Sequence, residues 1–561
     1  MRSTTLFTLA ASSVSFAVGI SGPEFHQLIP REAQLKADDP LPGPRRGSFD
    51  PVPPEQTEEE KSRAGEIKDM FKTAWDGYFK YAFPRDELRP ANNSFLNEYN
   101  GWALTLVDAL DTAALMGFDD LVSTSLDYIP SINYSRDSTD KVCSLFETNI
   151  RHLGGLLAAH ELFTGPLANL ATNKSEQVAA LLTQAQAVAD TLKFGFDTPT
   201  GIPQNNLYIN NRSTDNSTDN NIAQVGTLVL EWTRLSDKLG KDEYGKLAQK
   251  GEQYILKPQP SSGEPYPGLV GIEINITTGR FTRGLGGWVG GVDSFYEYLM
   301  KMWIYDQDRF SFYKDRWVTA VESSIKYLES HPSSRPDLTF LALHNETRIV
   351  GYSQHLACFD GGNWILGGLA LKEPRYVDFG LQLVDGCAAI YNETETGLGP
   401  NIFRWDPVGT PPEATKVPAN QTSFYRRAGF WIAQPGYGLG PEVVESFYHA
   451  WRATGDKKYQ ELIWGAFQSI REFTKVGSGY STIEDVNGKV GSGYGNYQPS
   501  FFLAETLKYM WLAFTPQSPV HVSGVEGPES QQWVFNTEAH PVKVFKPRDG
   551  GRRPKRDVLE G

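Results

Sequence analysis

Hydrophobic residues recur with helical spacing along most of the chain, and the helices that they predict follow a fixed order. An apolar helix is followed by a short turn with Gly or Asp, and then by an amphipathic helix with Lys, Glu and Gln on one side. Six such helical hairpins are predicted, over residues 105–129, 149–193, 227–256, 294–328, 364–391 and 445–473. One unpaired helix is predicted at each end of this series, over residues 64–82 and 501–514.

The two unpaired helices decide the fold class. A linear stack of hairpins would leave both of them exposed, whereas packing the first against the last closes a ring and buries both. The first helix of most hairpins is apolar nearly all round, so it should line the inside of the ring, with the second helix outside. We therefore predict an all-α fold, a closed (α/α)7 barrel of seven helix pairs, as a single domain over residues 61–541.

The two ends of the chain differ from the helical region in composition. After Met1 and Arg2, the apolar stretch over residues 6–20 is too short and too polar to span a bilayer, but it suits a secretory signal peptide. We predict a signal peptide over residues 1–20, with a membrane anchor as the alternative, and a Pro-rich linker over residues 21–60. Residues 542–561 are basic and rich in Pro and Gly, which predicts a disordered tail.

Composition and charge narrow the function. The chain has 561 residues, of which 40% are hydrophobic and 21% charged, as in a globular protein with a large core. Its net charge of −14 argues against a nucleic-acid or anionic-membrane partner, since neutralising phosphates needs a basic surface. We expect no stable membrane span and a monomeric protein.

Sequons and cysteines point to the secretory pathway. Nine Asn-X-Ser/Thr sequons are more than chance provides, and they predict glycosylation of a secreted protein, or of one in the endoplasmic reticulum or Golgi lumen. The sequons are at Asn92, Asn133, Asn173, Asn211, Asn216, Asn275, Asn345, Asn392 and Asn420. Of the three cysteines, Cys358 and Cys387 are the favoured disulfide pair, which leaves Cys143 as a buried thiol.

Acidic residues stand where the predicted inner helices begin. Glu147, Asp293 and Glu442 lie at three such openings, and Glu505 lies one turn into the last helix. In a closed ring these openings converge on one mouth, so the carboxylates would surround a single cavity, as hydrolysis of a glycosidic bond requires. Helix capping is the alternative for each acid, because Asp and Glu are favoured at helix N-termini.

Aromatic residues near the same mouth have two interpretations. They are Trp102, Trp288, Tyr296 and Trp364. Such rings stack on sugar faces in carbohydrate-binding sites, but they belong more often to the core. Periodicity and charge therefore predict a barrel with acidic residues at its mouth, but they do not identify the substrate or the reaction.

Ten blocks in chain order carry a resemblance to a known family. They include FETNIRHLGGLL from Phe146, DSFYEYLMK from Asp293, PEVVESFYHAWRATGD from Pro441 and FNTEAHP from Phe535. From about residue 64 to 541 the chain resembles glycoside hydrolase family 47, the class I α-1,2-mannosidases, and its secreted fungal members most. The resemblance implies an (α/α)7 barrel and Ca²⁺-dependent hydrolysis, with inversion, of terminal α-1,2-linked mannose from high-mannose N-glycans or glycoproteins.

The same resemblance implies roles for individual residues. Glu147 would be the general acid, Glu442 the general base and Asp293 a third catalytic carboxylate. Inversion requires a water between acid and base, which places such carboxyls roughly 6.5–9.5 Å apart. Thr537 matches the family's Ca²⁺ ligand, and Cys358 and Cys387 match its disulfide. The positions that contact the sugar or organise the site are Arg151, His355, Glu445, Phe501, Glu505 and Glu538.

Two departures from the family pattern keep other functions open. Gly440 stands where members usually carry Arg, and Gln224 stands where many carry Glu. Losing the Arg removes a rigid five-donor fork from the sugar site, so these departures favour an inactive mannose-binding module. A mannosidase-like factor of glycoprotein quality control is a further alternative. The intact acids and the FNTEAHP block favour an enzyme.

Overall fold

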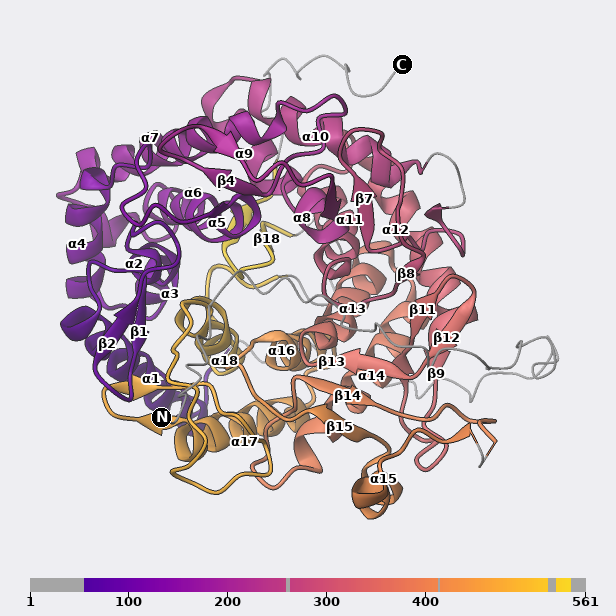
Figure 1. Cartoon of the computed structure of the whole chain (residues 1–561). Coiled ribbons are helices and arrows are strands. Elements are labelled where there is room, and N and C mark those ends of the chain that lie inside the picture. Colours follow the sequence, from indigo (N-terminus) through magenta and orange to yellow (C-terminus); the bar gives the residue numbers. More distant parts are fainter. Residues whose placement is uncertain (1–54, 259–262, 412–413, 523–530, 546–561) are drawn as a thin grey trace, which may run out of the picture.

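Figure 1 shows the computed structural model of the chain, in which helices surround a central region. The structure describes residues 55–258, 263–411, 414–522 and 531–545. The predicted signal peptide, the predicted linker up to residue 54 and the predicted tail from residue 546 lie outside these ranges. Helix α1 (Glu58–Tyr81) begins within the predicted linker because Thr57 caps it: the Thr57 hydroxyl accepts from the Glu60 N–H, and the Glu60 carboxylate accepts from the Thr57 N–H.

Each of the fourteen predicted helices is present. The first helices of the hairpins, with α18 as the last of this set, are α2–α3 (Leu104–Asp108 and Leu110–Leu115), α6 (Gly154–Phe163), α9 (Val229–Leu239), α11 (Asp293–Tyr305), α13 (Phe359–Leu371), α16 (Glu442–Thr454) and α18 (Leu507–Ala513). Their partners are α4 (Asp119–Tyr128), α7 (Ser175–Leu192), α10 (Glu243–Leu256), α12 (Ser311–Ser323), α14 (Pro374–Asn392), α17 (Lys457–Phe473) and α1. Helix α13 is buried almost all round and α17 on one side only, as their sequence patterns predict.

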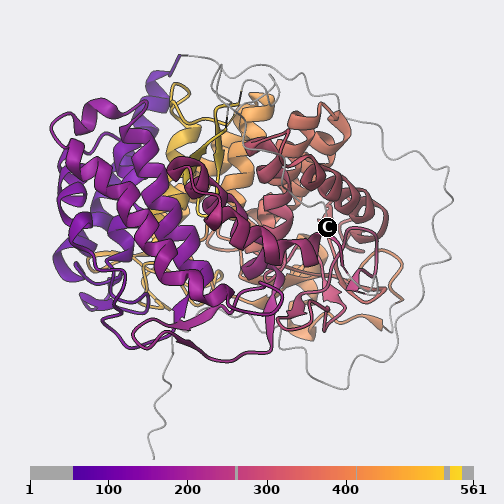
Figure 2. The ribbon, with the colours of Figure 1, turned by 90° about the horizontal axis from the view of Figure 1, so that it is seen from above.

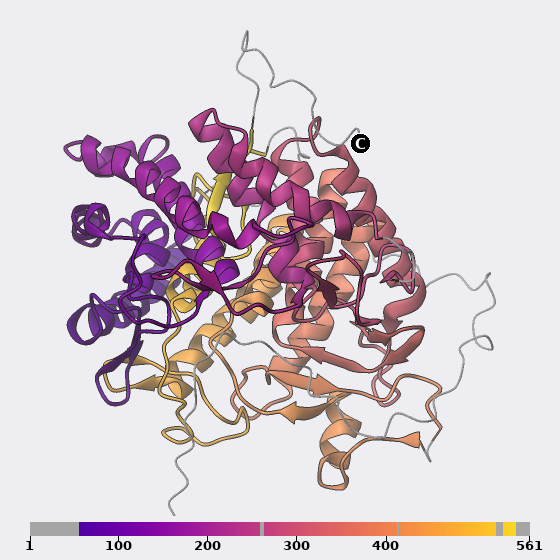
Figure 3. The same ribbon diagram turned by 45° about the horizontal axis from the view of Figure 1, so that its top comes forward.

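Inner helices contact one another in chain order. Helix α3 packs against α6, α6 against α9, and the series continues through α11, α13 and α16 to α18. The π-helical segment η11 (Phe502–Thr506), which leads into α18, packs against α3, so the last inner helix meets the first. Helix α1 in turn packs against α18. Figures 2 and 3 show the same neighbours, with the yellow C-terminal elements between the indigo and the orange helices.

The connections between hairpins contain short structure that hydrophobic periodicity does not predict. Three antiparallel strands, β13 (Tyr352–Gln354), β14 (Ile402–Arg404) and β15 (Trp431–Gln434), form one small sheet. Another sheet joins β3 (Cys143–Ser144), β4 (Asn206–Tyr208) and β5 (Ser213–Thr214). The remaining strands before the C-terminal hairpin are β1 (Glu87–Arg89), β2 (Ser94–Leu96), β6 (Asp219–Asn221), β7 (Glu273–Asn275), β8 (Leu285–Gly286), β9 (Glu329–Ser330), β10 (Phe340–Leu341), β11 (Leu343–Asn345), β12 (Arg348–Val350), β16 (Lys475–Val476) and β17 (Gly479–Tyr480). Further short helices are α5 (Leu145–Thr148), α8 (Ile222–Gly226) and α15 (Thr422–Ala428).

A C-terminal hairpin enters the ring of helices. Its strands are β18 (Trp533–Phe535) and β19 (Pro541–Lys543), and Figure 1 shows β18 inside the ring. This segment follows α18, the last helix. Strand β19 continues past residue 541, so the ordered part of the chain extends into the predicted tail.

Covalent features agree with the sequence where the structure describes them. Cys358 and Cys387 form a disulfide that ties the residue before α13 to α14, with their Cα atoms 5.9 Å apart. Cys143 is a free, buried thiol, and burial raises its pKa to about 12. The cysteine prediction is therefore confirmed.

Most of the sequon asparagines are accessible to a glycan. Seven are exposed, whereas Asn275 and Asn345 are half-buried. The side-chain amide of Asn275, in β7, donates to the Thr218 carbonyl oxygen over 3.0 Å, so a glycan attached there would share its nitrogen with this hydrogen bond. Among the described residues, no helix has the length and apolar character of a bilayer span.

Candidate active site

All ten residues predicted for catalysis, sugar contact and metal binding line one cavity of about 690 Å³. They are Glu147, Arg151, Asp293, His355, Glu442, Glu445, Phe501, Glu505, Thr537 and Glu538. These residues come from segments spread over most of the chain, and the starts of α5, α11 and α16 bring the three proposed acids together. The convergence predicted for the inner-helix starts is present.

Local helix geometry explains why the acids face the cavity. Asp293 and Glu442 are the first residues of α11 and α16, and the caps of these helices are Val292 and Pro441. Glu147 is itself capped, since its N–H donates to the Ser144 hydroxyl over 3.2 Å. None of the three acids occupies the capping position, and each side chain lines the cavity.

Arg151 contacts the proposed acid Glu147 and, on its other side, Ser500 and Glu538. It lies in the π-helical segment η3 (Asn149–Leu153), where its guanidinium donates to Glu147 Oε2 over 2.9 Å through Nε. Its Nη1 donates to the Ser500 hydroxyl over 2.9 Å and lies 3.1 Å from Glu538 Oε1. The rings of Tyr99 and Phe501 lie 5.5 and 5.4 Å from the guanidinium carbon. Arg151 therefore fixes two carboxylates in a buried setting.

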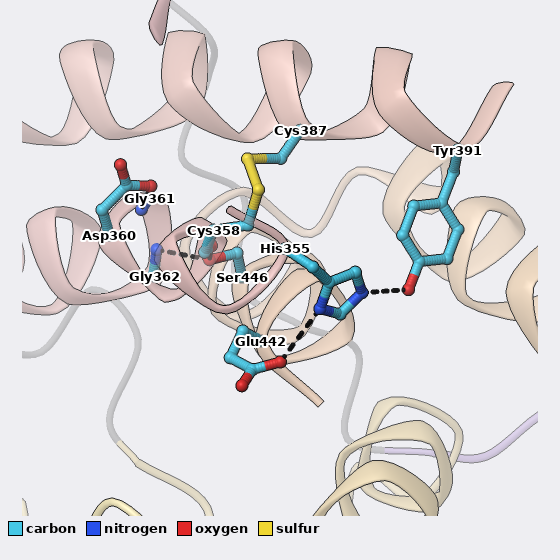
Figure 4. Close-up of a disulfide and its surroundings, with 9 residues drawn as sticks. All are labelled: His355, Cys358, Asp360, Gly361, Gly362, Cys387, Tyr391, Glu442 and Ser446. Carbon is cyan, nitrogen blue, oxygen red and sulfur yellow. Dashed lines mark hydrogen bonds and ion pairs between the residues drawn. A yellow bond between two sulfur atoms is a disulfide. The ribbon is translucent and has the colours of Figure 1, made fainter. Parts of the chain in front are cut away.

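His355 makes the corresponding contact to the proposed base. Its Nδ1 lies 3.1 Å from Glu442 Oε2, and its Nε2 lies 2.7 Å from the Tyr391 hydroxyl (Figure 4). Gly440 lies beside this contact, since a Cβ at this position would lie 2.6 Å from Glu442 Oε2. The position that departs from the family pattern therefore borders the base directly.

Burial and like charges alter the protonation of the other cavity carboxyls. Burial, with the negative charges of Glu297 and Glu442, raises the pKa of Asp293 to about 7. Burial also raises the pKa of Glu445 to about 8, although Lys301 opposes this shift. Burial and the neighbouring carboxylates raise the pKa values of Glu505 and Glu538 well above their usual range. The cavity thus gathers more carboxyl groups than its own cations can keep ionised.

Comparison with known proteins decides the family. Residues 70–544 match the profile of glycosyl hydrolase family 47. The chain belongs to this family. A mannosyl-oligosaccharide alpha-1,2-mannosidase 1B from Aspergillus oryzae is 50% identical over 484 residues, which are 86% of this chain and 92% of that protein. A mannosyl-oligosaccharide alpha-1,2-mannosidase from Coccidioides posadasii is 52% identical over 485 residues, 86% of this chain and 91% of that protein.

A solved structure extends the comparison to the fold. The alpha-1,2-mannosidase from Trichoderma reesei matches with a TM-score of 0.84 and 46% identity, over 86% of this chain and 99% of that one. The helix-rich fold described above is therefore a family 47 fold.

The floor of the cavity is suited to the metal ion on which family 47 mannosidases depend. Thr537 lies in the turn between β18 and β19, and its N–H lies 3.2 Å from the Tyr298 hydroxyl. Its oxygen atoms and the nearby carboxyls of Glu505 and Glu538 form an all-oxygen environment, which suits a hard divalent cation. Within the described residues, no three His, Cys, Asp or Glu side chains are grouped as direct ligands.

Long-range contacts hold the turn that carries Thr537. The Asn536 side-chain oxygen accepts from the N–H groups of Glu538 and His540, over 3.0 and 2.8 Å. The ring nitrogens of His540 lie 3.1 Å from Asp108 and 3.0 Å from Asp111. Burial alone would lower the pKa of His540, but these two carboxylates raise it, so the imidazolium donates to both.

The aromatic lining differs from the residues singled out in the sequence. Trp102, Trp288, Tyr296 and Trp364 are all buried, and none of them lines the cavity, so the core interpretation is correct. The aromatic side chains that do line it are Tyr99, Phe146, Phe359, Tyr497 and Phe501. Tyr497 lies in the irregular segment before the last helix, so helical periodicity does not mark it. Tyr99 lies in a loop held by Asp86, whose carboxylate accepts from the Tyr99 N–H over 2.8 Å, and no periodic pattern marks it.

Proposed function

We propose that this chain is a glycosidase that removes terminal α-1,2-linked mannose from high-mannose N-glycans, and that the cavity is its active site. The observation that carries the proposal is the meeting of Glu147, Asp293 and Glu442 in one cavity of a family 47 chain. The names of the relatives support the same substrate class.

Hydrolysis with inversion assigns a proton transfer to each side of the scissile bond. Glu442 takes a proton from water as the water oxygen bonds to the anomeric carbon, and a protonated acid gives a proton to the leaving glycosidic oxygen. Glu147, held by Arg151, is the proposed acid. Asp293 is the second candidate, because a pKa of about 7 lets it hold a proton near neutral pH.

We propose Ca²⁺ as the cofactor, with Thr537 as the protein ligand and waters between the ion and the carboxyls. A bound Ca²⁺ would accept sugar hydroxyls as ligands and so orient the terminal mannose. Asn536 and His540 hold the turn in place, and Phe501 supplies an apolar face beside Arg151.

Fold closure and cell location complete the proposal. The contact of η11 with α3 and of α1 with α18 supports a closed (α/α)7 barrel of seven pairs. Exposure of most sequons supports glycosylation in the secretory pathway, with secretion as the proposed destination. We also propose that the protein acts as a monomer.

The decisive experiment is incubation of the purified protein with a nine-mannose glycan. Trimming to smaller glycans, with β-mannose as the first product by proton NMR, is the expected result. Glu147→Gln and Glu442→Gln should each lower kcat by roughly 10²- to 10⁴-fold with little change in melting temperature. Retention of the glycan without any trimming would instead establish a mannose-binding module.

A further inference from the structure

A short hydrogen-bonded chain leads away from the cavity through His355. Figure 4 shows the imidazole between the carboxylate of Glu442 and the hydroxyl of Tyr391. The distances are 3.1 Å from Nδ1 to Glu442 Oε2 and 2.7 Å from Nε2 to the Tyr391 oxygen. Tyr391 is only 3% exposed and does not line the cavity, so it does not touch the substrate itself.

The chemistry of the two partners fixes the tautomer of His355. A carboxylate that acts as a base can only accept hydrogen bonds, so Nδ1 must carry the hydrogen that points at Glu442. In the neutral imidazole, Nε2 is then an acceptor, and the Tyr391 hydroxyl donates to it. Without this donor, the Nδ1–H tautomer loses its hydrogen bond at Nε2, and the other tautomer, in which the lone pair of Nδ1 faces the carboxylate of Glu442, becomes less unfavourable.

The surrounding structure holds His355 and Tyr391 at this spacing. Cys358 follows His355 by one turn, and Cys387 precedes Tyr391 by one turn on α14, so the disulfide joins the same two segments as the hydrogen bond. The ring of Tyr437 packs edge-on against His355, with centroids 5.4 Å apart. The disulfide and the ring of Tyr437 therefore restrain the positions of both side chains.

Gly440 provides the space for the contact with the base. A Cβ there would lie 2.6 Å from Glu442 Oε2 and 3.3 Å from His355 Nδ1. The φ angle of Gly440 does not lie in the left-handed region. Glycine is therefore needed here for the space that a side chain would fill and not for an unusual backbone conformation. A Cβ at this position would therefore require the end of the Glu442 side chain to shift from its present place beside the imidazole.

We propose that Tyr391 is a positioning residue for the general base, acting through the tautomer of His355, and that Gly440 is required for the contact between His355 and Glu442. The proposal rests on the proposed function, because it takes Glu442 as the base. It also explains how the chain holds its base without the arginine that family members usually carry at position 440.

The first test compares two tyrosine variants on one helix. Tyr391→Phe removes the donor to His355. Tyr376 lies on the same helix, α14, but outside the cavity, and Tyr376→Phe removes a hydroxyl that donates to Glu322 on α12. We expect kcat to fall about tenfold in Tyr391→Phe, the factor for loss of about 1.4 kcal/mol, with KM nearly unchanged. Tyr376→Phe should keep its kcat. An equal change in both variants would reduce Tyr391 to a structural residue and overturn the proposal.

A second measurement reads the tautomer without any substrate. In protein labelled with ¹⁵N-histidine, the His355 signals, identified by their loss in His355→Gln, should show a protonated Nδ1 and an unprotonated Nε2. In Tyr391→Phe they should move toward a mixture of tautomers, and in Tyr376→Phe they should not. Protonation of Nε2 in the unmodified protein would overturn the proposal. A protein that cannot hydrolyse mannosides would refute the proposed function alone, since the NMR result still decides the tautomer.

The third test concerns Gly440. Gly440→Ala should lower kcat about tenfold, the factor for about 1.4 kcal/mol. Gly465→Ala on α17 is the control, because a Cβ there meets nothing within 4 Å and Gly465 does not line the cavity. If both residues act through one contact, Gly440→Ala combined with Tyr391→Phe should lose little more than either change alone. Fully additive losses in the double variant would contradict a shared contact.

Discussion

Replacement of Arg151 by Lys tests the network that holds the proposed acid. The guanidinium spans Glu147, Ser500 and Glu538, with N–O distances of 2.9, 2.9 and 3.1 Å. A single ammonium group cannot reach all three, so at least one charge-assisted hydrogen bond is lost. Such a bond is worth about 1.5–3 kcal/mol, which corresponds to about a ten- to hundredfold change in rate if the loss falls on the transition state.

Removing the charge altogether should do more damage. In Arg151→Met the side chain of Glu538, only 3% exposed, loses its cation. Breaking a buried ion pair by removing one partner costs about 3–5 kcal/mol of stability. We therefore expect the melting temperature to fall further in Arg151→Met than in Arg151→Lys, and kcat/KM on a nine-mannose glycan to fall in both.

A second buried arginine supplies the control. Arg234 pairs with Glu161 between α9 and α6, and neither lines the cavity. Arg234→Lys should lower the melting temperature while kcat stays within a factor of about two. The reasoning would be refuted if Arg151→Lys behaved like Arg234→Lys, with a lower melting temperature and an unchanged kcat.

Three further predictions follow from other parts of the molecule. Gly440→Arg should change kcat/KM or the order of product isomers from a nine-mannose glycan by at least about tenfold, and identical kinetics and isomers would contradict it. Exhaustive chelation should abolish hydrolysis and lower the melting temperature, because an ion bound only by the folded chain stabilises it; full activity after chelation would exclude the proposed ion. Glu252 is buried without a hydrogen-bond partner among the described residues, and burial raises its pKa well above 4.5. The free energy of unfolding should therefore fall as pH rises from about 4.5 toward the higher pKa that Glu252 has in the folded state. Glu252→Gln should remove this fall. Glu243→Gln, at an exposed position of the same helix, should keep it.

The helices were predictable because each one buries a stripe or its whole surface, and that requirement leaves a periodic pattern. The same pattern predicts where the inner helices begin. Asp293 and Glu442 are the first residues of two of them, α11 and α16, and both line the cavity. Strands such as β13 and β14 have three residues each, which is too short for a period of two to be recognised. Their existence depends on which loops meet in the folded chain.

The contacts that orient the site were beyond the reach of a sequence pattern. His355 and Tyr391 are 36 residues apart and meet only because α13 and α14 pack against each other. Thr537 would be an ordinary turn residue on sequence grounds, and only the family resemblance marked it. Its place in the cavity depends on His540 reaching Asp108 and Asp111, two residues near the other end of the chain.

That last contact also sets the order in which the site can form during synthesis. Asp108 and His540 are separated by 432 residues, which a ribosome adds in on the order of 20 to 90 s. During this time most helices of the ring can emerge and fold, but the turn with Thr537 and Glu538 does not yet exist. Until this turn packs against the helices, Asp108 and Asp111 lack the His540 imidazolium, and the cavity lacks the lining residues Thr537 and Glu538. The chain therefore gains its active site only after residue 540 has been added, when all nine sequons have already been made.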